Sequence, residues 1–157
     1  MNIKLLAIGK TDNKALQTLI DDYTKRLGFY VKFDLEIIPD IKNVKNLSEA
    51  QQKEKEGELI LSKLSPTDQL ILLDENGKTF SSVGFSEEMQ KKMNSGVKTL
   101  VYVIGGPYGF SPEVYAKAQG KVSLSSMTFS HQMVRLFFIE QVYRAFTILR
   151  NEPYHHQ

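Results

Sequence analysis

The sequence predicts an α/β protein in which helices cover both faces of a parallel β-sheet. Apolar runs of strand length, rich in β-branched residues, recur along the chain, and segments with helical spacing of apolar residues separate them. Strands that alternate with helices favour parallel pairing, because each helix supplies the crossover that a parallel pair requires. At 157 residues without repeats or linkers, the chain is expected to form one domain over residues 1–157.

The amino-terminal part of the chain has the pattern strand, helix, strand. Residues 4–9 and 31–38 are apolar or alternating, as is typical of strands. Between them, over 15–27, apolar residues recur at helical spacing. We therefore expect a first crossover unit within the first forty or so residues.

A second helix and a buried strand follow. Asn46 and Glu49 have the spacing of a capping box, so a helix is predicted to begin there and to end near Leu64, before a proline. Residues 69–73 form a continuous apolar run that predicts a strand buried on both faces, and residues 74–77 have the composition of a turn that ends it.

The remaining segments continue the alternation. Helices are expected over 82–94 and from Pro112, capped by Ser111, to about residue 119. Strands are expected over 99–104 and 122–124. A last helix, capped by Ser130, ends near Asn151, and its buried side is predicted to comprise Val134, Phe138, Val142, Ala145, Phe146 and Leu149.

Composition excludes several classes of protein. The absence of cysteine excludes a disulfide framework, a thiol nucleophile and a thiolate zinc site, and three histidines leave little room for any metal site. No apolar run approaches the roughly 18 residues of a membrane span, and the amino terminus lacks the cleavage site of a signal peptide, so a cytoplasmic protein without membrane association is expected. A net charge of +2 is weak evidence for nucleic-acid binding.

Three segments are expected at the carboxyl ends of strands, where open α/β sheets bind ligands. They cover residues 73–78, 105–109 and 124–129. Gly105 and Gly106 permit either the close approach of a ligand or a tight strand-to-helix turn. Neither the P-loop pattern nor the dinucleotide fingerprint is present, which disfavours a phosphate-bearing cofactor.

Single residues carry weaker signals. Asp74 is interpreted as a turn residue rather than a ligand-binding one, and His131 as a neighbour of a helix cap rather than a catalytic group. Tyr154, His155 and His156 have a stronger functional case, because the folding of a terminal tail does not require them. The alternative for these three is a histidine-rich tail remnant.

Taken together, the loops and the tail resemble the RlmH family of ribosomal RNA large-subunit methyltransferases, along the whole chain. The resemblance rests on five motifs in order: Leu73-Asp74-x-x-Gly77-Lys78, Ile104-Gly105-Gly106-Pro107-x-Gly109, Leu124-Ser125-x-Met127-Thr128-x-x-His131-Gln132-x-x-Arg135, Glu140-Gln141-x-Tyr143-Arg144-Ala145 and Pro153-Tyr154-His155.

The resemblance implies a SPOUT-type parallel sheet flanked by helices, with a carboxyl-terminal trefoil knot. It also implies a homodimer, S-adenosyl-L-methionine as methyl donor, and methylation of N3 of a pseudouridine in 23S rRNA of the assembled ribosome. By position in the family, the cofactor-binding residues would be Leu73, Gly105, Leu124, Ser125, Ser126, Met127, Thr128 and Phe129.

The same resemblance suggests roles for the tail. N3–H of the target base is a weak acid, so a general base or a cation that stabilises the developing anion is needed. Arg144 is expected to stabilise that anion or to bind phosphate, and Tyr154 and His155 to contact the target nucleotide, with His155 as proton acceptor. Arg135 and Glu140 would instead hold the helix and the dimer.

Two other functions compete with this interpretation. One is a ribosome-associated binding protein that keeps the cofactor pocket without turnover. The other is an unknotted α/β oxidoreductase that binds a nucleotide, which only the glycine-rich turn supports. Because few residues of the chain could bind phosphate, the folded ribosome rather than free 23S RNA is the expected substrate.

Overall fold

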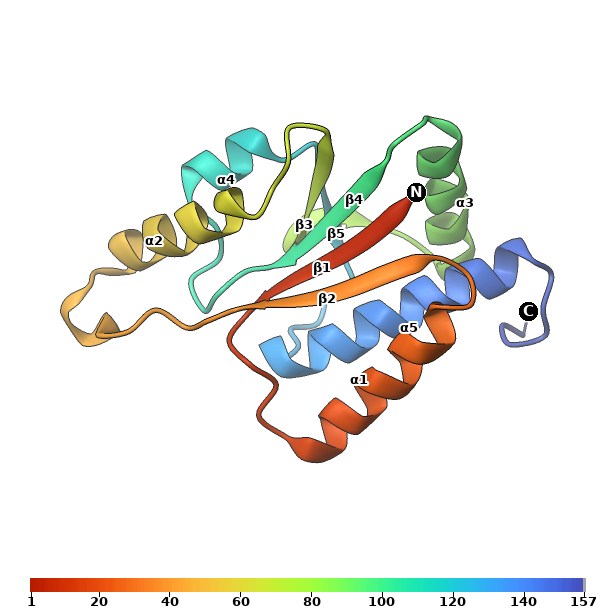
Figure 1. Cartoon of the computed structure of the whole chain (residues 1–157), viewed down its shortest axis with the longest axis horizontal. Helices are drawn as coiled ribbons and strands as arrows, with labels where there is room; N and C mark the ends of the chain where they lie inside the picture. Colours follow the sequence, from red (N-terminus) through yellow and green to blue (C-terminus); the bar gives the residue numbers. More distant parts are fainter. Residues whose placement is uncertain (157) are drawn as a thin grey trace.

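The computed structural model describes residues 1–156, and within them five strands form one parallel sheet of order β2-β1-β4-β3-β5. The central strands β1 and β4 pair in register from Asn2 and Thr99 onward, so their carboxyl ends reach the same edge. Figure 1 shows the strands side by side through the middle of the molecule. Their bounds are β1 Asn2–Ile8, β2 Lys32–Ile38, β3 Asp68–Thr79, β4 Thr99–Ile104 and β5 Gly120–Ser123.

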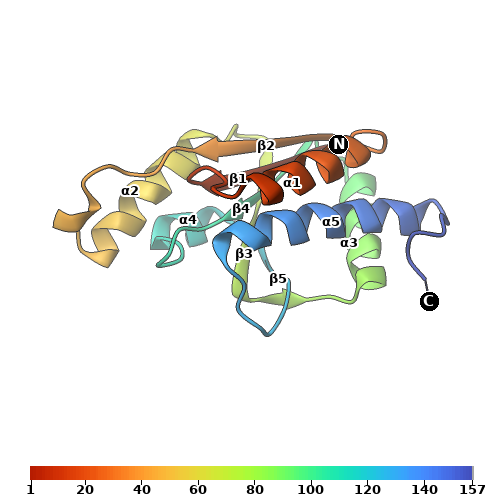
Figure 2. The ribbon, with the colours of Figure 1, turned by 90° about the horizontal axis from the view of Figure 1, so that it is seen from below.

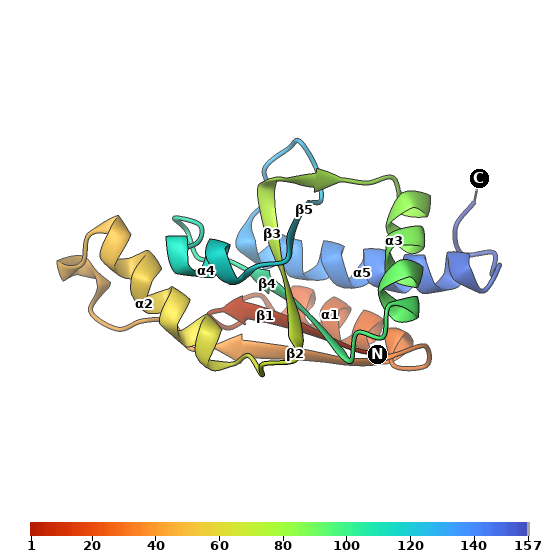
Figure 3. The same ribbon diagram turned by 90° about the horizontal axis from the view of Figure 1, so that it is seen from above.

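Helices cover both faces of the sheet, as the sequence predicted. On one face α5 packs against α1 and α3 (Figure 2). On the other face α2 and α4 lie side by side (Figure 3). The helix bounds are α1 Lys14–Leu27, α2 Glu49–Ser62, α3 Ser82–Asn94, α4 Pro112–Lys117 and α5 His131–Leu149, and a short 3₁₀ helix, η1, covers Val44–Asn46.

Two apolar cores lie on the two faces of the sheet. Successive residues of a strand point to opposite faces, so Leu5 packs in the core under α1, α3 and α5, whereas Leu6 packs in the core under α2 and α4. Both side chains are fully buried. This explains why the central strands are apolar without alternation.

Most of the predicted elements are confirmed. The helix over 82–94 and the strand over 99–104 have the predicted bounds, and Ser111 and Ser130 cap α4 and α5 through their side chains. The predicted start of α2 was wrong. Asn46 ends the short 3₁₀ helix, and the capping box is formed by Ser48 and Gln51, whose side chains each bond the other residue's amide.

The end of β3 also differs from the prediction. Residues 74–77 do not end the strand but form an irregularity within it, since β3 pairs with β5 up to Leu73 and again from Lys78. Gly77 permits this return, because a Cβ at that position would lie 2.6 Å from the backbone of Val122. The segment that predicts a turn therefore bulges out while the strand continues.

The buried side of α5 includes residues that the apolar pattern missed. Val134 and Leu149 are only partly buried, whereas Arg135 is 1% exposed. Its guanidinium donates to Thr11 Oγ1 and to the carbonyl of Ile8, both at 3.0 Å. Arg135 thus ties α5 to the carboxyl end of β1 within the chain.

The predicted threading of the carboxyl-terminal loop into a trefoil knot stays a prediction. Among residues 1–156, no helix has the length and apolar character needed to cross a membrane.

Candidate active site

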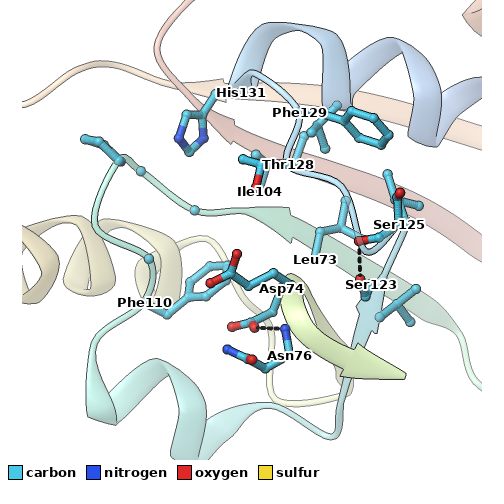
Figure 4. A pocket seen from close by; sticks show the side chains of 18 of the residues that line it. Leu73, Asp74, Asn76, Ile104, Phe110, Ser123, Ser125, Thr128, Phe129 and His131 are labelled. Carbon is cyan, nitrogen blue, oxygen red and sulfur yellow. Dashed lines mark hydrogen bonds between the residues drawn. The ribbon is translucent and has the colours of Figure 1, made fainter. Parts of the chain in front are cut away.

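A cavity of about 440 Å³ lies at the carboxyl ends of β3, β4 and β5, where the three segments singled out in the sequence meet (Figure 4). Of the eight residues expected to bind the cofactor, Ser126 alone does not line it. The other seven do: Leu73, Gly105, Leu124, Ser125, Met127, Thr128 and Phe129. Sequence reasoning therefore placed these seven in one region of space.

The glycine-rich turn after β4 forms one wall of the cavity. Gly109 has φ +83°, and its amide donates to the carbonyl of Gly106 at 3.1 Å. A Cβ at Gly105 would lie 3.1 Å from the ring of Phe110, whereas a Cβ at Gly106 would lie 1.9 Å from a carboxylate oxygen of Glu56. Position 106 therefore requires glycine for close packing, and Gly105 also packs tightly, against Phe110 and the Gly109 carbonyl.

The segment after β5 forms the opposite wall. Ser123 Oγ donates to the carbonyl of Ser125 at 3.0 Å, and Ser125 Oγ accepts from the amide of Met127 at 2.9 Å. These bonds fold the loop on itself, and Leu124 and Phe129 of the same segment line the cavity. A cleft that combines apolar side chains with polar groups such as Asp74, Ser125 and Thr128 is typical of sites for small organic ligands.

Asp74 and His131 border the cavity from opposite sides in Figure 4. Asp74 accepts from the amide of Asn76 at 2.8 Å, as its interpretation as a turn residue predicts, and also from the hydroxyl of Tyr115 at 2.5 Å. Burial and this bond raise the pKa of Tyr115 to about 12. Both Asp74 and His131, given structural roles from sequence, are therefore also positioned to meet a ligand.

A second polar cluster surrounds the carboxyl-terminal end of α5. Glu140 Oε1 accepts from Arg144 at 2.6 Å and from the hydroxyl of Tyr154 at 2.9 Å. Arg144 also contacts His155 Nδ1 at 3.1 Å and lies over the Tyr154 ring, 4.8 Å from its centroid. The three residues predicted to be catalytic, Arg144, Tyr154 and His155, are therefore brought together.

The tail that carries Tyr154 and His155 is anchored. Burial, the neighbouring hydroxyl of Tyr23 at 3.1 Å, and Glu140 together raise the pKa of Tyr154, so this phenol is protonated at neutral pH. Its ring packs edge-on against Tyr143 with centroids 4.7 Å apart. Glu152 accepts from the hydroxyl of Tyr30 at 2.5 Å. The tail thus has fixed partners on α1 and α5.

The two clusters lie at opposite ends of α5. His131 begins the helix beside the cavity, whereas Arg144 follows about 20 Å along the axis at 1.5 Å per residue. Figure 1 shows the tail leaving the far end of α5. Within one chain, the structure therefore does not bring the catalytic candidates to the cofactor-binding candidates.

Sequence reasoning missed several residues of this region. Ile104, Phe110 and Tyr115 line the cavity, and Glu56 lies directly behind Gly106. The strand-end position of Ile104 was a usable signal, but Glu56 and Tyr115 belong to helices whose packing the sequence does not specify. No group of three or more His, Cys, Asp or Glu side chains within residues 1–156 is arranged to hold a metal ion.

A parallel α/β sheet with a cavity of mixed polar and apolar lining at the carboxyl ends of its strands defines a protein built to bind a small organic ligand, as many cofactor-dependent enzymes are. Comparison with known families is more specific. The family model described as "Predicted SPOUT methyltransferase" matches residues 1–155, and the chain belongs to this family.

Full-length relatives agree with this assignment and confirm the resemblance drawn from the five motifs. The chain is 90% identical over 157 residues to a protein of Flavobacterium johnsoniae, 85% identical to one of Flavobacterium psychrophilum and 67% identical to one of Christiangramia forsetii. Each alignment covers the whole of both chains, and each relative is named ribosomal RNA large subunit methyltransferase H.

Proposed function

We propose that this protein transfers a methyl group from S-adenosyl-L-methionine to 23S rRNA, at N3 of a pseudouridine in the assembled ribosome. Membership of a methyltransferase family and full-length relatives named as large-subunit rRNA methyltransferases support the reaction class and the substrate. The single observation that carries the proposal is the meeting of the three motif-bearing segments around one cavity. Residues 1–157 would act as one domain in the cytoplasm, where ribosomes occur.

The cavity fits the proposed cofactor. Its apolar side chains, Leu73, Leu124, Met127 and Phe129, suit an adenine ring, and Gly105, which lines the cavity without a side chain, permits close approach of the ligand to the backbone. The acidic groups at its edge, Asp74 and Glu75, suit a ligand that carries ammonium and sulfonium charges. When bound, the cofactor supplies a methyl group already activated on its sulfonium.

The cluster of Arg144, Tyr154 and His155 would supply the remaining chemistry. Positioning of N3 in line with the methyl group contributes several kcal/mol to catalysis in comparable reactions, and the loss of the N3 proton leaves an anion. The guanidinium of Arg144, held by Glu140, would stabilise that anion. Tyr154 and His155 would contact the base, with His155 as proton acceptor.

A homodimer would join the two clusters. Met127, Met133 and Phe137 are 75%, 38% and 36% exposed, and the rings of Phe129 and Phe137 lie 4.9 Å apart. An exposed apolar face of this kind supports association of two copies. If two chains pair through it with their α5 helices in opposite directions, the tail of one chain lies near the cavity of its partner. We infer an active site composed from both chains.

The test is the transfer of tritiated methyl groups from S-adenosyl-L-methionine to ribosomes that lack this modification, with free 23S RNA as a parallel substrate. Incorporation at N3 of pseudouridine on ribosomes, with little on free RNA, is expected. Comparable incorporation into free RNA would overturn the substrate assignment. Cofactor binding without incorporation into either substrate would favour a non-catalytic ribosome-associated role.

A further inference from the structure

Glu56 is a buried carboxyl without a partner, and the mechanism above does not use it. It lies on the side of α2 that faces the sheet and is 3% exposed. Among residues 1–156, neither of its carboxylate oxygens has a hydrogen-bond partner. Buried carboxylates without partners are costly and rare, so the position requires a physical explanation.

Its surroundings place the carboxyl directly behind the cavity wall. A Cβ on Gly106 would lie 1.9 Å from Glu56 Oε2 and 2.8 Å from Oε1, so the carboxyl occupies the space that any side chain at position 106 would need. Gly106 itself lines the cavity. The neighbouring Gly57 packs as closely on Ser111, where a Cβ would lie 2.4 Å from Oγ. Helix α2 therefore holds Glu56 one glycine away from the ligand space.

The electrostatic surroundings of this carboxyl disfavour its charged form. Burial raises the pKa of Glu56, Asp40 adds to the rise, and Gln52 and His131 partly oppose it. Of the described residues that line the cavity, none is Lys or Arg, whereas Asp74 and Glu75 are acidic. The raised pKa favours the neutral carboxyl when the cavity is empty, and a cation bound in the cavity would favour its ionised form, because a charge interaction in a poorly polarisable interior extends across a glycine.

We propose that Glu56 makes the cavity selective for the positively charged sulfur of S-adenosyl-L-methionine over the uncharged sulfur of the product, S-adenosyl-L-homocysteine. The inference rests on the proposed function, because it names how the same cavity distinguishes donor from product. Glu56 acts through the electrostatic field behind Gly106 and is a specificity-determining residue, not a catalytic one. The positive charge of the ligand would be the partner that this carboxylate lacks. Methyl transfer removes that charge, and its loss favours release of the product.

The test measures the binding of three ligands to the full chain by calorimetry. These are S-adenosyl-L-methionine, S-adenosyl-L-homocysteine and sinefungin, in which a protonated amine replaces the sulfonium. Glu56→Gln keeps the shape of the side chain and removes its charge. Glu58→Gln, an exposed position on the same helix, is the matched control. The thermal unfolding of each ligand-free variant is measured in parallel.

In Glu56→Gln, the affinity for the two cationic ligands is expected to fall about tenfold, while the affinity for S-adenosyl-L-homocysteine stays within about twofold. The melting temperature should stay equal or rise, because the variant removes a carboxyl whose ionised form burial disfavours. Glu58→Gln should change neither quantity.

Equal weakening of all three ligands, no change in any of them, or a lower melting temperature of Glu56→Gln would overturn the charge-selection role in favour of a purely structural one. Failure of the wild-type chain to bind S-adenosyl-L-methionine at all would instead overturn the proposed function, and this inference with it. The two failures are therefore distinguishable by the wild-type titration alone.

Discussion

Arg144 Nη1 and His155 Nδ1 lie 3.1 Å apart at the carboxyl-terminal end of α5. A guanidinium has only donors, so Nδ1 must accept this bond, and a neutral His155 ring then carries its proton on Nε2. In this arrangement neither ring nitrogen has a free lone pair. His155 can accept a proton at Nδ1 only after Arg144 turns away. Attraction of the Arg144 guanidinium to an anionic substrate would cause this movement.

His155→Ala tests the predicted proton acceptor. Turnover on ribosomes should fall by about 10²–10⁴-fold, the range for loss of a general base. The affinity for S-adenosyl-L-methionine should not change, because His155 is proposed to contact the target base and not the cofactor. Single-turnover methyl transfer and calorimetric titration measure the two quantities. Unchanged turnover with normal ribosome binding would exclude the proton-acceptor role.

Arg144→Ala should lower turnover by about 10²–10³-fold, as does the loss of one group that stabilises a developing anion. Arg144→Lys should restore little, because an ammonium cannot contact Glu140 and His155 together as the guanidinium does. Arg26→Ala is the control, since Arg26 forms an i, i+4 pair of the same kind with Asp22 but in an exposed position. Steady-state rates on ribosomes decide the result.

An active site composed from two chains can be tested by complementation. Arg144→Ala and Gly105→Leu should each be inactive, the second because the new side chain fills the cavity beside Phe110. Co-expression should restore about one quarter of wild-type activity, since half of the dimers are mixed and each has one intact composite site. Sites contained within single chains would give no recovery.

Two neighbouring phenylalanines should separate dimer formation from folding. Phe138 is fully buried and packs on Tyr102 with centroids 4.6 Å apart, so Phe138→Ala should lower the free energy of unfolding by about 3–5 kcal/mol. Phe137 is 36% exposed, and Phe137→Ala should instead raise the dissociation constant of the dimer with little effect on monomer stability. Urea unfolding and sedimentation equilibrium measure these effects. A monomeric wild-type protein would contradict the dimer.

The Tyr30–Glu152 anchor should make stability dependent on alkaline pH. The hydrogen bond to Glu152, with burial, raises the pKa of Tyr30 to about 12 from its ordinary value near 10. The folded state therefore holds this proton more tightly than the unfolded state. The contribution of this group is complete below about pH 10 and is lost as the pH rises toward 12. Unfolding free energies over this interval should fall less steeply in Tyr30→Phe, and identical slopes would contradict the anchor.

Much of this fold could be predicted because local patterns and tertiary packing agree. Helix α3 and strand β4 have the predicted bounds, since their periods match the faces that they bury. The local pattern predicted the wrong structure at two places. At Asn46 the nearby Ser48 forms the cap instead, and at residues 74–77 pairing with β5 overrides the turn signal. In both places a longer-range contact or a stronger local bond outweighed the pattern.

The sequence by itself determined the α/β class, the family and the three segments that meet at the cavity, because these depend on local periodicity and on motifs in a fixed order. Only the tertiary structure decided that Arg144 and the tail lie about 20 Å along α5 from the cavity. It also decided that Glu56 stands behind Gly106. Such relations depend on how helices distant in sequence pack across the sheet, and no local pattern encodes that packing.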